Sequence, residues 1–151
     1  MSNVNLTPDY LFEVSWEVCN KVGGIHTVIA SKAPTVMQML GDKYITIGPD
    51  FAQDAAKPEF MEDASLFAAL REALYAKGVR VRIGRWMIDG NPIAILIDFK
   101  SFFNQKDDIL KQLWESYHVD SLSGQWDYVE PVLFGHAAGV VIAEFTRSMA
   151  T

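Results

Sequence analysis

The sequence predicts an α/β fold in which a mixed, mainly parallel sheet is flanked by helices. Short runs rich in β-branched and aromatic residues alternate with longer segments of helical periodicity, and this alternation is typical of a parallel sheet with crossover helices. A turn signal, "DGNP", between two apolar runs adds an antiparallel hairpin. The chain has 151 residues, half of them hydrophobic, which suits a single unit with a substantial core.

The first third of the chain predicts a strand, a helix and a second strand. The run "YLFEVSWEV" (10–18) is short and rich in strand-forming residues. Helical spacing of apolar residues begins at Gly24, and Pro34 should end or kink that helix because it lacks a backbone NH. "YITIG" (44–48) then reads as a strand that stops at Gly48-Pro49.

The middle of the chain predicts a surface excursion, a helix and the hairpin. We expect residues 50–60 to run over the surface and residues 61–78 to form an amphipathic helix. "VRVRIGRWMI" (79–88) alternates strictly between apolar and polar residues, as a half-buried strand does. Its partner strand is the apolar run "IAILIDF" (93–99).

Two helices are predicted in the last third, over 104–119 and 127–150. Pro131 is tolerable in the second only if it lies in the first turn. Large apolar residues cover most of that helix, so we expect it to be buried on more than one side. No strand follows it, and we therefore expect residues 1–151 to be part of a larger protein.

Composition excludes several classes of function. The formal net charge is −6, which argues against nucleic acid as a main partner because such binding depends on neutralising phosphates. The sequence shows neither a signal peptide nor an apolar run long enough to span a membrane. Cys19 is the only cysteine, and we expect a packing role for it and a cytoplasmic location for the protein.

The stretch "NKVGG" (20–24) lies at the first joint between a strand and a helix. One interpretation is a tight turn. The other is a phosphate site, because glycines let the backbone approach a ligand, the helix start offers free NH groups, and Lys21 adds a positive charge. The stretch matches neither a dinucleotide fingerprint nor a P-loop, so spacing alone leaves both interpretations open.

Other polar residues favour structural roles. The three histidines (His26, His118, His136) have no metal-ligand spacing, and we predict no metal site. Glu13 and Glu17 are four residues apart, and we prefer hydrogen-bonding roles to a catalytic dyad, with Glu17 as a possible partner that orients Lys21. The arginines of the alternating strand (Arg80, Arg82, Arg85) suggest a solvated basic face, and contact with another part of the full protein or with a glucan is the alternative.

"FEVSWEVCNKVGGIHTVIASKA" resembles the N-terminus of glycogen synthases of the animal and fungal type. The resemblance continues through "YITIGPD", "KGVRVRIGRWMIDGNPIAILID", "LWESYHVDS" and "VLFGHAAGVVIAEF", in matching order and spacing. It covers nearly the whole chain from about residue 10.

This resemblance implies the N-terminal part of the first Rossmann-like domain of a two-domain GT-B glycosyltransferase. The implied reaction transfers glucose from UDP-glucose, preferred over ADP-glucose, to the non-reducing end of an α-1,4-glucan with retention. The implied roles of Lys21, Gly23 and Gly24 are contacts with the phosphates and glucose of the donor.

The family's catalytic glutamates lie beyond residue 151, so we expect no catalytic residue in this chain and no activity of the chain alone. We also expect no cofactor and a homo-oligomeric protein. A non-catalytic interaction domain and a GT-B enzyme with another donor remain as alternatives.

Overall fold

The computed structural model describes residues 9–20, 23–50, 59–99 and 126–149. In chain order the elements are β1 (Leu11–Val14), α1 (Gly24–Leu40), a 3₁₀ turn (Gly41–Lys43), β2 (Tyr44–Pro49), β3 (Phe60–Glu62), α2 (Ala68–Ala76), β4 (Arg80–Trp86), β5 (Ile93–Asp98) and α4 (Trp126–Met149). The helix predicted over 104–119 lies outside the described residues.

The strands form one five-stranded sheet in the order β1-β2-β5-β4-β3. β1, β2 and β5 pair in parallel, whereas β4 is antiparallel to both β5 and β3. Four strands therefore run in one direction and β4 runs against them. This confirms the predicted mixed, mainly parallel sheet, with β4 and β5 as the predicted hairpin.

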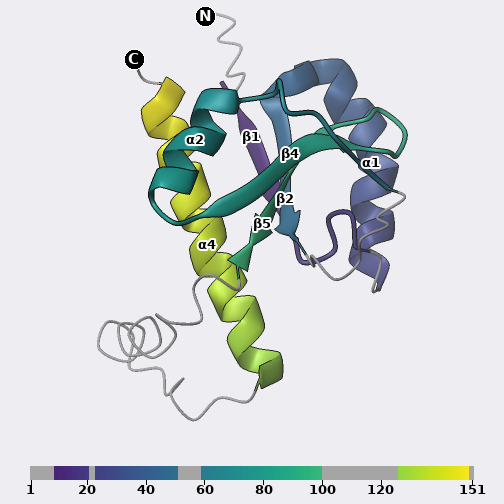
Figure 1. Ribbon diagram of the computed structural model, residues 1–151. Coiled ribbons are helices and arrows are strands. Elements are labelled where there is room, and N and C mark those ends of the chain that lie inside the picture. The colour runs from purple at the N-terminus through teal and green to yellow at the C-terminus, as the bar shows by residue number, and fades with distance from the viewer. Residues whose placement is uncertain (1–8, 21–22, 51–58, 100–125, 150–151) are drawn as a thin grey trace, which may run out of the picture.

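Helices cover both faces of the sheet: α1 lies on one side, and α2 and α4 lie on the other (Figure 1). The larger core cluster joins α2 and α4 to alternate residues of β2, β4 and β5, including Ile47, Ile83 and Ile95. The smaller cluster lies on the α1 side and contains Cys19, which is buried as expected, and Trp86. Strict alternation along β4 thus sends its apolar residues into the core, as the sequence predicts.

Two boundaries predicted from the sequence were wrong. The first strand ends at Val14 rather than at residue 18, because the chain turns there and the Val18 NH donates to the Ser15 carbonyl. Phe60–Glu62 form β3 instead of a loop and the start of a helix, and α2 begins only at Ala68. Pairing with β4, which sets Phe60 opposite Trp86, overrides the helical pattern there.

Pro34 and Pro131 both lie inside helices. α1 continues past Pro34 to Leu40, so of the two predicted outcomes, a helix end or a kink, the helix end did not occur. Pro131 lies beyond the first turn of α4, which begins at Trp126. Each proline removes one backbone hydrogen bond. Burial of the neighbouring Ala33 and Leu133, which are fully buried, offsets this cost.

α4 packs its large apolar side chains inward. Leu133, Phe134, Val141 and Phe145 are buried, whereas the exposed positions are Pro131, Gly135, Gly139, Ala143, Thr146 and Arg147. Val132, Val140 and Ile142 are partly exposed and also pack against this core, so large apolar residues cover most of the helix circumference, as predicted. Among the described residues, no helix has the length and apolarity needed to cross a membrane.

Candidate functional site

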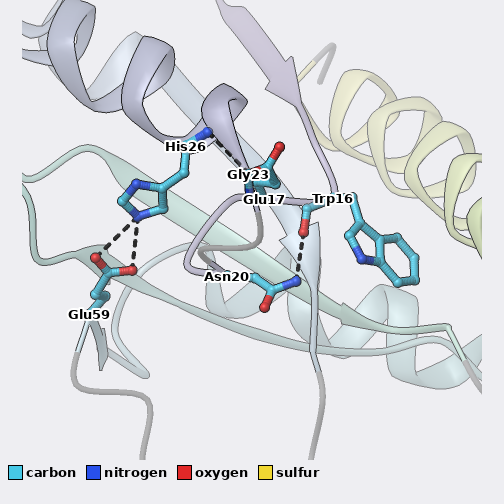
Figure 2. Close-up of polar contacts among 6 residues, drawn as sticks. All are labelled: Trp16, Glu17, Asn20, Gly23, His26 and Glu59. Atoms are coloured by element: carbon cyan, nitrogen blue, oxygen red, sulfur yellow. Dashed lines mark hydrogen bonds and ion pairs between the residues drawn. The ribbon is translucent and has the colours of Figure 1, made fainter.

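The loop between β1 and α1 leaves the sheet at the carboxyl ends of the parallel strands, where open α/β sheets bind ligands. Its first residues are held by a series of hydrogen bonds. The Ser15 NH donates to the Ile47 carbonyl at 3.0 Å, which extends the contact between β1 and β2. The side chain of Asn20 donates to the Trp16 carbonyl at 3.0 Å (Figure 2). The loop therefore has a defined path over the edge of the sheet.

Gly48 in β2 allows the loop to lie close to the sheet. A Cβ atom at this position would lie 2.7 Å from both the Cβ and the carbonyl oxygen of Val18, which is fully buried. Such contacts are far shorter than normal packing distances, so only glycine leaves room for Val18 here.

Glu17 binds the amino end of α1. Its Oε1 accepts a hydrogen bond from the Gly23 NH at 2.5 Å and one from the His26 NH at 3.4 Å (Figure 2). The side chain is buried, so the carboxylate satisfies donors that a helix start leaves free and interacts favourably with the helix dipole.

Glu13 and Glu17 have different partners. Glu13 accepts from the Tyr44 hydroxyl at 2.8 Å and from Lys32 Nζ at 2.5 Å. It lies on β1, whereas Glu17 lies in the turn that follows. The two glutamates are not on one strand, and their separate hydrogen bonds agree with our preference against a catalytic dyad.

Neither described glycine of the "NKVGG" stretch is explained by the fold. Gly23 has an extended backbone (φ −151°, ψ −154°), and Gly24 is not among the residues with positive φ. A Cβ atom at Gly23 would make ordinary contact with Glu17 Oε1 at 3.6 Å, and one at Gly24 would meet no described atom within 4 Å. Among the described residues, neither backbone conformation nor packing requires glycine at these two positions, and glycine leaves open space beside the helix start.

The chemistry of this helix start suits an anion. Within the described parts of the chain, the NH groups of Gly24 and Ile25 make no hydrogen bond, and they lie at the positive end of α1. Glu17 already occupies two neighbouring NH groups and contributes a negative charge. A bound phosphate would therefore need a nearby cation, and Lys21, which lies outside the described residues, is the residue that we expect to provide it.

His26 connects the first turn of α1 to the end of the sheet that is formed by β3 and β4. Its Nε2 lies 3.1 Å from both carboxylate oxygens of Glu59 (Figure 2). Its ring meets the ring of Trp86 edge to face, with the centroids 5.5 Å apart. The expected packing role of His26 is confirmed. Glu59 was missed, because residues 33 positions apart carry no local signal of their pairing.

The predicted solvated basic face on β4 was wrong in part. Arg85 makes two hydrogen bonds to the carboxylate of Asp42, at 2.6 and 3.0 Å. Arg82 lies 3.5 Å from Asp50 and 3.3 Å from Glu62. Acidic partners therefore balance two of the three arginines. In the described segments, no group of three or more histidine, cysteine or acidic residues could hold a metal ion.

The model of the glycogen synthase family matches residues 13–151, and this range includes the Glu17 cap and the glycine stretch. The chain belongs to the glycogen synthase family. It is 38% identical over 140 residues to the liver glycogen [starch] synthase of Rattus norvegicus, covering 90% of this chain and 20% of that protein. It is 34% identical over 137 residues to glycogen [starch] synthase of Neurospora crassa, covering 89% of this chain and 19% of that protein.

A more distant relative is glycogen [starch] synthase of Dictyostelium discoideum, which is 30% identical over 141 residues, or 91% of this chain and 16% of that protein. This glycogen synthase family chain therefore spans a fifth or less of the curated relatives that it matches.

Proposed function

We propose that this chain supplies the donor-phosphate loop of a glycogen synthase. The whole protein would transfer glucose from UDP-glucose to the 4-hydroxyl group at the non-reducing end of an α-1,4-glucan, with retention of configuration. The observation that carries this proposal concerns the start of α1. Among the described residues, neither backbone conformation nor packing requires glycine at Gly23 or Gly24, and the NH groups of Gly24 and Ile25 have no hydrogen-bond partner. Membership of the glycogen synthase family supports it.

In this proposal Gly23 and Gly24 let the donor diphosphate approach the helix, and Lys21 balances its charge. Negative charge grows on the diphosphate as the glycosidic bond breaks, and positioned NH groups and cations stabilise that charge most in the transition state. The catalytic glutamates would come from outside residues 1–151, in the second domain of a GT-B protein. The 151 residues alone would then be inactive.

The proposal extends to the surroundings of the reaction. We expect the nucleotide sugar to be a substrate and no further cofactor to be needed, with UDP-glucose preferred over ADP-glucose. We also expect a cytoplasmic homo-oligomer.

Two alternatives predict different outcomes. A non-catalytic interaction domain would use the same fold, with "NKVGG" as a plain turn, and a different GT-B enzyme would use another donor. Purified whole protein is incubated with glycogen and radiolabelled UDP-glucose, ADP-glucose or GDP-mannose, and incorporation into glycogen is measured. Transfer from UDP-glucose supports the proposal. Absence of transfer from every donor favours the interaction domain, and transfer from GDP-mannose alone favours the different enzyme.

A further inference from the structure

His26 is held through both its backbone and its side chain. Figure 2 shows its backbone NH directed to Glu17, 3.4 Å from Oε1, and its ring directed to Glu59, with Nε2 3.1 Å from both carboxylate oxygens. A carboxylate only accepts hydrogen bonds, so Nε2 carries the proton that is shared. The His26 side chain is 9% exposed, and water therefore competes little with this hydrogen bond.

Glu59 is fixed to the sheet by its own backbone. It directly precedes β3, and its carbonyl accepts a hydrogen bond at 2.6 Å from the NH of Met87, the residue that follows β4. Phe60, the next residue after Glu59, pairs with Trp86 across the two strands. These contacts do not involve α1. The hydrogen bond from His26 therefore attaches the helix to a point that the sheet already holds in place.

The two glutamates hold α1 on either side of its free NH groups. Glu17 binds the NH of Gly23, and Glu59 binds the side chain of His26. Between these points lie Gly24 and Ile25, whose NH groups make no hydrogen bond among the described residues. Helix ends fray because their first NH groups lack partners. Attachment on both sides keeps these two NH groups in one orientation.

We propose that the hydrogen bond between His26 and Glu59 is a positioning contact for the sugar donor. It holds the NH groups of Gly24 and Ile25 where the diphosphate of a nucleotide sugar binds. This role rests on the proposed function, and it adds β3 and β4 to the elements that support the donor loop. A displacement of about 1 Å in a group that binds substrate can cost about 10²-fold in rate, so a loosened first turn weakens donor binding.

Packing of the His26 ring against Trp86 is the competing explanation, and two substitutions separate the roles. His26→Phe keeps an aromatic ring beside Trp86 but has no NH group to donate. His26→Gln loses the ring and keeps an NH group that can reach Glu59. In the same way, Glu59→Ala removes the acceptor, whereas Glu59→Gln keeps an acceptor oxygen.

Lys32→Met is the matched control. Lys32 also joins α1 to the sheet, because its Nζ binds Glu13 on β1, but it lies about two turns from the helix start. Loss of this ion pair removes a contact of the same helix without touching its free NH groups. We therefore expect a normal donor KM in this variant.

The experiment measures transfer from radiolabelled UDP-glucose to glycogen by the whole protein. We expect donor KM to rise about fivefold or more in His26→Phe and Glu59→Ala, and to stay within about twofold of wild type in the two glutamine variants. The double variant His26→Phe/Glu59→Ala should be no worse than either single variant, because both remove one bond. A merely structural role would lower the melting temperature and the active fraction, and hence kcat, without changing donor KM.

A wild-type donor KM in His26→Phe and Glu59→Ala would overturn the positioning role. So would a raised donor KM in His26→Gln but not in His26→Phe, because that pattern assigns the effect to ring packing. Both results leave the proposed function intact when the wild type transfers glucose.

Calorimetric binding of UDP gives the same comparison without turnover. A whole protein that transfers no glucose from any donor, but binds UDP more weakly in His26→Phe and Glu59→Ala, contradicts the proposed function and supports the positioning contact. A folded wild-type protein that neither transfers glucose nor binds UDP would overturn both.

Discussion

The carboxylate of Glu17 holds the amino end of α1 by accepting a hydrogen bond from the Gly23 NH at 2.5 Å. A second, longer bond comes from the His26 NH at 3.4 Å. Gly23 occupies the N-cap position but has no side chain to serve as a cap. Glu17 provides that cap from six residues earlier, and in doing so it closes the loop that carries the candidate phosphate site.

We expect Glu17→Ala to destabilise the protein by about 0.5–2 kcal/mol, the usual cost of losing a helix cap. Glu17→Gln should cost less, because it keeps an acceptor oxygen and loses only the favourable charge at the helix start. Urea unfolding of both variants measures the difference. An unchanged midpoint for Glu17→Ala would show that the carboxylate does not hold the loop.

Gly24→Ala should impair donor binding without harming the fold. The new methyl group meets no described atom within 4 Å, and alanine in the first helical turn restricts the unfolded chain, so stability should stay equal or rise by about 0.4–1 kcal/mol. In the proposed function the methyl group enters the space of the diphosphate. Donor KM should then rise by about tenfold or more, since displacements of about 1 Å can cost 10²-fold. A normal donor KM in steady-state kinetics would argue for a plain turn.

Gly48→Ala should destabilise the fold, whereas Gly24→Ala should not. Its Cβ would lie 2.7 Å from the backbone oxygen of Val18, so the loop or the strand must move. Overpacking of this kind costs about 1–3 kcal/mol. Thermal unfolding measures this cost. Gly24→Ala makes the same chemical change at an open position and serves as the control. Equal stability of the two variants would contradict the close packing of Val18 on β2.

The order of elements could be predicted because hydrophobic periodicity is local. Alternation over β4 and helical spacing in α1 are visible within a few residues, and the "DGNP" turn indicates the hairpin directly. β3 could not be predicted, because its three residues form a strand only through pairing with β4. Pro34 lies inside α1, so the local rule that a proline ends or kinks a helix did not fix the end of this one.

Only part of the candidate site could be predicted from the sequence. Gly23 and Gly24 belong to a local pattern, so their position at a helix start could be predicted. The Glu17 cap and the contact between His26 and Glu59 depend on how the chain folds back, and no spacing rule encodes them. The structure also favours the phosphate-site interpretation over the plain turn, because neither Gly23 nor Gly24 has the positive φ that would require glycine.

The pair of Asp42 and Arg85 should make stability depend on pH at the acidic end. Hydrogen bonds from Arg85 hold the pKa of Asp42 below its ordinary value, with the charge of Arg85 as a further cause and partial burial opposing both. A lowered pKa in the folded state stabilises the protein above the unfolded pKa of about 3.9, and that stability is lost as the pH falls through the folded pKa.

Because Asp42 is largely exposed, we expect Asp42→Asn to cost only about 0.2–1 kcal/mol at pH 7, and the difference from wild type should vanish near pH 2. Urea unfolding at both pH values checks this. Asp89→Asn, at an exposed aspartate without an ion pair among the described residues, serves as control. A pH-independent difference for Asp42→Asn would show that the ion pair is not its cause.

Lys21→Ala in the whole protein should reduce glucose transfer by roughly a hundred- to a thousandfold, equivalent to about 2.7–4 kcal/mol of transition-state stabilisation. The physical reason is that Glu17 already places a negative charge at the helix start, so the leaving diphosphate depends on a cation beside it. A lysine in a plain surface turn would change stability by no more than about 0.5 kcal/mol and leave the rate unaffected. Lys32→Ala, which removes an exposed lysine bound to Glu13, is the matched control and should retain normal turnover. Radiolabelled transfer at saturating UDP-glucose separates the two roles, and near-normal turnover of Lys21→Ala with an unchanged donor KM would leave "NKVGG" as a turn.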